Sequence, residues 1–122
     1  MRTELEEQKK IFAWKMSQIA AGHTSLQLLG FVPNGTDFLN RFGIMLGKRY
    51  GILSGFPDMF FLKPAGPFHG LFIELKRIGP WGKIRYRQRI MGKLLEQSGY
   101  RFRLCRGSED AIREILEYEQ LG

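Results

Sequence analysis

The sequence predicts a small α/β domain in which a mixed sheet is flanked by helices. Three observations favour this fold. Apolar residues recur at helical spacing near both ends of the chain and again at about residues 86–98. Two apolar runs flank a Pro-Ala-Gly-Pro turn cluster, as they do in a β-hairpin. Residues 100–106 alternate between apolar and basic side chains, which is typical of a strand with one buried face. With 122 residues, we expect one domain over residues 1–122.

The first helix is predicted over about residues 4–21. Thr3 and Glu6 have the spacing of a capping box, and Gly22 is suited to end the helix. The apolar stripe that we expect to face the core consists of Leu5, Ile11, Phe12, Trp14, Met16 and Ile19. Between His23 and Gly55, glycine and proline interrupt every periodic pattern. We therefore expect an irregular segment there, with one short helix at about residues 37–46.

The remaining elements follow in the order strand, strand, helix, strand, helix. The hairpin strands are predicted at residues 58–63 and 68–76, around a turn at 64–67, and a loop follows at 79–82. A helix at about 86–98 presents Ile90, Met91, Leu94 and Leu95, and Gly99 ends it. A strand is expected at 100–106. Ser108 is expected to cap a last helix, whose apolar face is formed by Ala111, Ile112, Ile115 and Leu116.

The charge is concentrated in one stretch of the chain. The net charge is +7, and residues 76–106 carry ten Lys or Arg residues against a single acid, Glu96. Such clustering indicates a polyanionic partner, although a solvated basic face is the plainer interpretation. The chain contains no apolar run near the roughly 20 residues that cross a bilayer. Its first ten residues are charged and polar and Cys105 is its only cysteine, so we expect a cytoplasmic protein with that thiol buried in a strand.

Two acidic residues are placed symmetrically in the predicted hairpin. Asp58 and Glu74 lie at equal distances from Gly66, in the middle of the turn cluster. If the chain folds back there, both carboxylates lie at the same end of the hairpin. Glu74 and Lys76 are two residues apart in a strand, so their side chains share a face. The hairpin therefore predicts two carboxylates and one ammonium group on one surface.

This combination points to a divalent metal ion, because burying unpaired charges is costly. Mg²⁺ takes carboxylate and carbonyl oxygens and keeps several water molecules, and the carbonyl of Leu75 is available as a third ligand. Such a metal polarises phosphate and activates water. Lys76 would orient or deprotonate that water, or stabilise the developing charge. The plainer alternative is a salt bridge at the strand end, between Lys76 and either Asp58 or Glu74.

Several short motifs together resemble one nuclease family. They are Gly55-Phe56-Pro57-Asp58, Gly70-Leu71-Phe72-Ile73-Glu74-Leu75-Lys76, Gln88 and Gly99-Tyr100. The opening Glu4-Leu5-Glu6-Glu7-Gln8, the Pro33-Asn34-Gly35 loop and the close at Gly107 with Ala111-Ile112 are similar as well. This pattern resembles the VRR-NUC family, a branch of the PD-(D/E)xK nucleases, in its short virus- and prophage-type form. The likeness covers nearly the whole chain.

The resemblance implies a restriction-endonuclease-like fold and DNA cleavage that depends on Mg²⁺ or Mn²⁺. It implies that Asp58 and Glu74 bind the metal, that Lys76 is the lysine of the ExK motif, and that Gln88 is an additional active-site residue. An acid on the first helix completes the family pattern; Glu4 fits best, and Glu7 is the alternative. The resemblance to short family members also implies a homodimer that acts on branched DNA such as four-way junctions. It implies a location in a bacterial or phage-infected cell.

The sequence departs from the family pattern at Arg85, where a Ser or Thr often caps the helix that carries the glutamine. Gly92 interrupts the same helix, one turn beyond Gln88, where we expect it to leave room beside the active site. The side chains expected to contact DNA are Lys83, Arg85, Arg87 and Arg89. His23 and His69 are expected to be structural or surface residues. The main alternative function is a basic DNA-binding module without catalysis; an RNA-binding protein is less favoured, because no aromatic RNA-binding motif is present.

Overall fold

A computed structural model describes residues 3–32, 53–79 and 83–122. Its elements are α1 (Glu4–Ala20), the 3₁₀ helix η1 (Thr24–Leu28), β1 (Leu29–Phe31), β2 (Met59–Phe61), β3 (Leu71–Lys76), α4 (Tyr86–Gln97), β4 (Arg101–Arg106) and α5 (Ser108–Glu119). The strands form one sheet in the order β1-β2-β3-β4. The first two pairings are antiparallel and β3 pairs with β4 in parallel, which confirms the predicted mixed sheet. The helix predicted near residues 37–46 lies outside the described residues.

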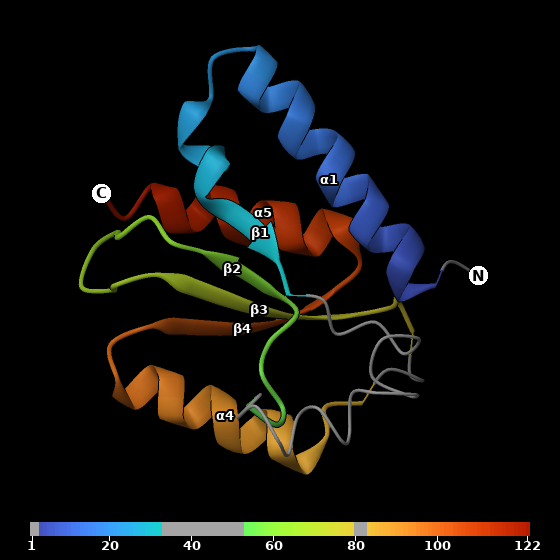
Figure 1. The fold of residues 1–122 in the computed structure, drawn as a ribbon, viewed down its shortest axis with the longest axis vertical. Helices are drawn as coiled ribbons and strands as arrows, with labels where there is room; N and C mark the ends of the chain where they lie inside the picture. The colour runs from blue at the N-terminus through green and yellow to red at the C-terminus, as the bar shows by residue number, and fades with distance from the viewer. Residues whose placement is uncertain (1–2, 33–52, 80–82) are drawn as a thin grey trace.

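Helices cover both faces of the sheet (Figure 1). α1 and α5 lie on one side, and α4 lies on the other. The core forms on the first side, where alternate residues of β3 and β4 such as Ile73 and Cys105 pack with Ile11, Ile115 and Tyr118. Burial of the Cys105 thiol, as predicted, raises its pKa to about 12. The intervening residues of β3, among them Glu74 and Lys76, face α4. The sheet therefore separates an apolar core from a face that carries buried charge.

The hairpin has the predicted register. Met59 pairs with Ile73 and Phe61 with Leu71, so each pair is symmetric about Gly66. Ala65 and Phe68 exchange backbone hydrogen bonds across the turn, and Gly66 takes a positive φ of 54°. The turn fixes which residues of the two strands face each other. One residue beyond the Met59–Ile73 pair, the same register places Asp58 opposite Glu74.

Residues 24–31 form two elements that the sequence did not predict. η1 and β1 follow α1, and β1 forms the edge of the sheet against β2. Gly30 was interpreted as a breaker, but it pairs with Phe60 inside the sheet. A Cβ at this position would lie 2.5 Å from the Phe60 ring, so the glycine makes room for that aromatic side chain.

The apolar faces of α1 and α4 differ from those expected. On α1, Leu5, Phe12 and Met16 are exposed, whereas the buried residues are Glu7 and Ile11. Half of the predicted stripe is confirmed, because Ile11 is buried and Trp14 and Ile19 pack against the core. The other half was wrong because Glu7 lies on the buried face instead, where its carboxylate accepts the Ser108 N–H at 2.6 Å.

On α4, Ile90 and Leu94 are exposed, and the buried position is Gly92. A Cβ there would lie 2.6 Å from the Phe102 ring. Gly92 therefore brings α4 close to β4; it does not leave room beside the active site. In α5, Ser108 is the first helical residue and Gly107 is the N-cap, with a φ of 87°. Leu116 is exposed, and Tyr118 extends the buried face instead.

Candidate active site

The segment that precedes β2 is anchored on α4 and β3. Gly55 has a φ of 75°, and a Cβ there would clash with the carbonyl group of Arg87. This glycine therefore lets the segment rest directly on the first turn of α4. Phe56 makes an edge-to-face contact with Phe72 of β3, at 5.4 Å between ring centroids, and Pro57 is buried. These contacts fix the position of the next residue, Asp58.

The Asp58 carboxylate lies at the end of the hairpin, beside the backbone of β3. Its Oδ2 accepts the Leu75 N–H at 2.8 Å. The N–H and the carbonyl of one residue in an extended strand face the same strand edge. The Leu75 carbonyl therefore faces the edge on which Asp58 lies, just past the last β2 pairing. The Asp58 carboxylate and the Leu75 carbonyl, two of the three oxygen donors proposed from the sequence, therefore lie at the same edge of β3.

Glu74 is buried among charged and polar groups and is only 2% exposed. Its Oε1 accepts a hydrogen bond from Gln88 Nε2 at 2.6 Å and lies 3.5 Å from Lys76 Nζ. Its Oε2 is buried and accepts no hydrogen bond from any described residue. Burial raises the pKa of Glu74 to about 8; the Asp58 charge adds to the rise, and Lys76 opposes it. An isolated carboxylate is disfavoured at this position unless a cation accompanies it.

Gln88 connects β3 to the start of α4. While its Nε2 donates to Glu74, its Oε1 accepts the Arg85 N–H at 2.8 Å. This contact is one half of a capping box, in which the side chain three residues into the helix accepts the N–H of the capping residue; the other half, a serine or threonine hydroxyl that accepts the Gln88 N–H, is missing at Arg85. α4 begins at Tyr86 despite the missing hydroxyl. One side chain therefore both secures the helix start and holds a carboxylate of the site.

Most, but not all, of the active-site residues predicted from the sequence lie together in the structure. Asp58, Glu74, Lys76 and Gln88 are brought together, with the Leu75 carbonyl beside them. Glu4 is exposed in the first turn of α1, whereas Glu7 is buried against the start of α5, next to the end of β3. Among the described residues, no group of three His, Cys, Asp or Glu side chains is placed to hold a metal ion, so a third acid does not join Asp58 and Glu74 there. The role of an acid from the first helix stays a prediction.

Seven of the ten basic residues of segment 76–106 fall into two groups. Arg101 and Arg103 lie within 3.4 Å of the Glu114 carboxylate, and the Arg106 guanidinium donates to the Gly79 carbonyl. The second group surrounds the start of α4, is exposed, and forms no ion pair with any described carboxylate: Lys83, Arg85, Arg87 and Arg89. This second group is available to an anionic partner beside Gln88.

The two histidines have structural surroundings. His23 Nε2 lies 2.6 Å from Glu119 Oε1, at the opposite end of the sheet from Glu74. The His69 ring makes an edge contact with Tyr100 at 5.6 Å. Neither touches the carboxylates of the candidate site, in agreement with the predicted structural or surface roles.

Comparison with solved structures relates this fold to a known domain. A chain described as a "VRR_NUC domain protein" superposes with a TM-score of 0.80 at 27% sequence identity, over 99% of this chain and 91% of that one. No family model and no curated protein matches the sequence. The extent of the superposition, together with the placement of Asp58, Glu74 and Lys76 on one surface, agrees with the family resemblance of the sequence. The chain therefore has the fold of a VRR-NUC domain protein, and this likeness supports a nuclease-type domain.

Proposed function

We propose that this protein is a DNA endonuclease that depends on Mg²⁺ or Mn²⁺ and hydrolyses phosphodiester bonds at Asp58, Glu74 and Lys76. The observation that carries the proposal is the state of Glu74. It is a buried carboxylate opposite a second carboxylate, and one of its oxygens accepts no hydrogen bond from the described residues. A salt bridge to Lys76 is present, as the plainer interpretation expects, but it engages only Oε1.

The donor set suits a hard divalent cation. Asp58, Glu74 and the Leu75 carbonyl offer oxygen ligands only, and Mg²⁺ or Mn²⁺ is favoured by such ligands. Two carboxylates and one carbonyl leave coordination positions for water and phosphate, which is the usual arrangement of Mg²⁺ in nucleotide-processing sites. When bound, such an ion polarises the phosphate and activates water for hydrolysis.

The chain's own side chains position the reacting groups. Lys76 is held beside Glu74 and nearly buried, so its ammonium group can donate to a phosphate oxygen as negative charge develops there. Gln88 keeps the Glu74 carboxylate in place through its amide. In the reaction, a water oxygen bonds to phosphorus and the water loses one proton, one ester P–O bond breaks, and the leaving oxygen takes up a proton.

Substrate binding is assigned to the exposed cations around the start of α4. Lys83, Arg85, Arg87 and Arg89 form no ion pair within the described part of the chain, so they can neutralise phosphates and release counterions. By resemblance to short family members, we propose branched DNA as the preferred substrate and a homodimer as the acting species. A dimer would present two active sites, which suits incision of two strands. No helix among the described residues is long and apolar enough to span a membrane.

A cleavage assay tests the proposal directly. Linear, flap and four-way DNA would be incubated with the protein and Mg²⁺, Mn²⁺ or EDTA. We expect cleavage with either metal and none with EDTA. Asp58→Ala should be inactive, while Glu117→Ala, which changes an exposed acid of α5, serves as a matched control with normal activity. DNA binding without any cleavage would favour the non-catalytic module, and full activity of Asp58→Ala would refute the assignment.

A further inference from the structure

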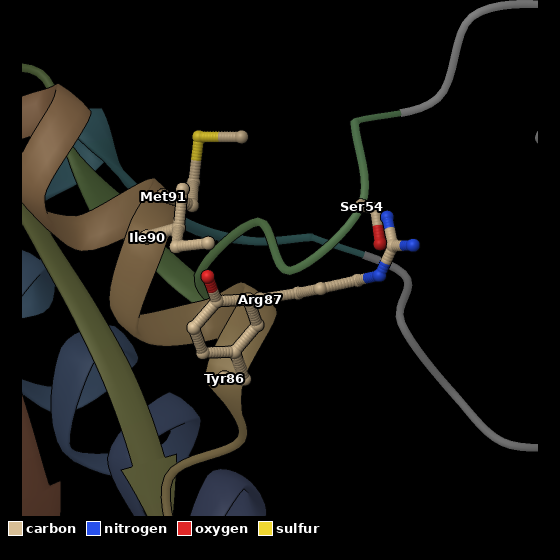
Figure 2. A pocket seen from close by; sticks show the side chains of 5 residues that line it. All are labelled: Ser54, Tyr86, Arg87, Ile90 and Met91. Carbon is tan, nitrogen blue, oxygen red and sulfur yellow. The ribbon is translucent and has the colours of Figure 1, made fainter.

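A pocket lies between α4 and the segment that leads to Asp58 (Figure 2). Its volume is about 340 Å³, and its lining residues are Ser54, Tyr86, Arg87, Ile90 and Met91. Figure 2 shows the Arg87 side chain extending from α4 to Ser54, with Tyr86 next to it on the helix and Ile90 and Met91 one turn further on. The helix supplies one wall and the segment around Ser54 supplies the other.

The lining combines an aromatic ring, aliphatic side chains and a guanidinium group. Tyr86 is 76% exposed and Ile90 is 41% exposed, so core packing does not explain why these residues are apolar. An aromatic ring with a neighbouring cation is the means by which proteins hold single-stranded nucleic acid, since every base offers a flat face for stacking. The volume lies near the low end of the roughly 300–1,000 Å³ of small-molecule sites, which suits one flat ring system and excludes a duplex.

Both walls of the pocket lead to the candidate active site. Gly55, next to Ser54, rests on the backbone of Arg87, and Asp58 follows three residues later. On the helix, Arg87 is adjacent to Gln88, whose amide contacts Glu74. A group in the pocket therefore lies next to the residues that position Asp58 and Glu74.

The electrostatic surroundings select an anionic ligand. Besides Arg87 in the lining, Lys83, Arg85, Arg89 and Lys93 are exposed in α4 or within three residues of its start, and Glu96 is the only acid in α4. A cationic ligand is repelled there, and an uncharged one gains nothing from these residues. Nucleic acid combines a flat base for Tyr86 with a phosphate for the cations.

We propose that this pocket binds one unpaired nucleobase of the DNA substrate, stacked on Tyr86, with Arg87 placed at its backbone. The proposal rests on the proposed nuclease function and specifies its substrate as DNA with an unpaired nucleotide beside the cleaved phosphate. In an intact duplex each base is stacked between its neighbours, and extruding one costs energy. Unpaired nucleotides avoid that cost. The pocket thus gives a physical reason for cutting near gaps, flaps or junctions.

Binding without cleavage tests the proposal. Wild type, Tyr86→Ala and Tyr86→Phe would be titrated in EDTA with a fully paired duplex and with a duplex of equal phosphate number that contains a short single-stranded gap. Tyr86→Ala should weaken binding to the gapped probe by roughly 5- to 150-fold, the range expected for one stacked base. Binding to the paired duplex should change little, and Tyr86→Phe should restore the affinity. Phe12→Ala, which removes an exposed aromatic side chain from α1, should affect neither probe.

An abasic nucleotide placed in turn at each gap position completes a double-mutant cycle. At one position the missing base should weaken wild-type binding, and the same change should have no further effect in Tyr86→Ala. Equal losses on both probes, or losses that add at every position, would overturn the base pocket. This result is separable from the nuclease proposal: the pocket fails if DNA is cleaved but Tyr86 has no influence, and the nuclease fails if stacking is seen but no metal supports cleavage.

Discussion

Two largely buried glutamates at opposite ends of the sheet have opposite surroundings. Glu119, in α5, is satisfied on both oxygens: Oε1 lies 2.6 Å from His23 Nε2, and Oε2 accepts from Ser25 Oγ at 2.6 Å and from Lys63 Nζ at 3.1 Å. Burial alone would raise the pKa of Glu119, but these hydrogen bonds outweigh it and leave the pKa below its usual value. Around Glu74 the balance is reversed, and its pKa rises to about 8.

The difference in hydrogen bonding and in pKa distinguishes a structural carboxylate, Glu119, from a carboxylate that is suited to bind a cation, Glu74. Glu119 ties η1, the hairpin end and α5 together, and its charge is already compensated by the protein. Glu74 faces a second carboxylate, Asp58, and keeps one oxygen without a hydrogen bond from the described residues. Such an arrangement costs stability in the isolated protein and is compensated when a cation binds.

The largest expected effect comes from replacing each glutamate by its amide. Glu74→Gln should lower the cleavage rate by at least about 10³-fold, because residues that act as one catalytic unit fail together. Its thermal stability without metal should equal or exceed that of wild type. Glu119→Gln should keep cleavage and lose about 1–3 kcal/mol of unfolding free energy, since charged hydrogen bonds are lost. Cleavage rates and thermal unfolding of both variants measure this contrast, and a reversed pattern would contradict it.

Gln88→Ala should have the next largest effect. Loss of the amide that orients Glu74 should slow cleavage by about 10- to 100-fold, as expected for a residue that positions a metal ligand. Stability should fall by about 1–3 kcal/mol, because two hydrogen bonds are lost, one at the helix start and one to Glu74. Gln97→Ala, at the other end of α4, is the matched control. A parallel loss of stability and activity would show that Gln88 is only structural.

The two groups of cations should differ in their salt dependence. Replacing Arg85, Arg87 and Arg89 together by Ser should reduce the slope of log affinity for DNA against log salt by up to about 2–3, or roughly 0.9 for each phosphate contact. Replacing Arg101 and Arg103, which pair with Glu114, should leave the slope nearly unchanged. Binding isotherms over a salt series measure both slopes. Equal slopes would show that the start of α4 faces away from DNA.

The smallest effect is a dependence of stability on pH. Because the pKa of Glu74 is raised in the folded state, the fold binds a proton that the unfolded chain releases, and stability falls as pH rises from the ordinary carboxyl range through about 8. A divalent cation replaces that proton. The increase in unfolding temperature on adding Mn²⁺ should therefore be greater at about pH 8.5 than at about pH 6. Glu74→Gln should show no such difference, and an equal increase at both pH values would be inconsistent with this account.

The parts of the fold that depend on local pattern could be predicted from the sequence. The hairpin register follows from the turn cluster, and with it the opposition of Asp58 and Glu74. The mixed sheet follows from the order of the elements. Gln88 could be assigned only through the family resemblance, because its contact with Glu74 spans a loop and a helix start.

The errors arose where a distant partner decides the local structure. β1 was missed because the Phe60 ring that requires Gly30 comes from a strand about 30 residues later. The face of α1 was misassigned because Glu7 is stabilised by the backbone of Ser108, near the other end of the chain. The role of Gly92 depends on Phe102 in the following strand. The roles of these glycines and of the buried Glu7 depend on tertiary contacts. The periodicity of apolar residues within one element carries no information about such contacts.

Calorimetric titration of Mn²⁺ into the wild-type protein and into the two amide variants tests the central claim most directly. The account predicts saturable binding to wild type and to Glu119→Gln, and no binding to Glu74→Gln at the same concentrations. Both variants should give the circular dichroism spectrum of the folded wild type. Undiminished Mn²⁺ binding by Glu74→Gln, or no binding by wild type, would contradict the assignment of Asp58 and Glu74 as the metal site.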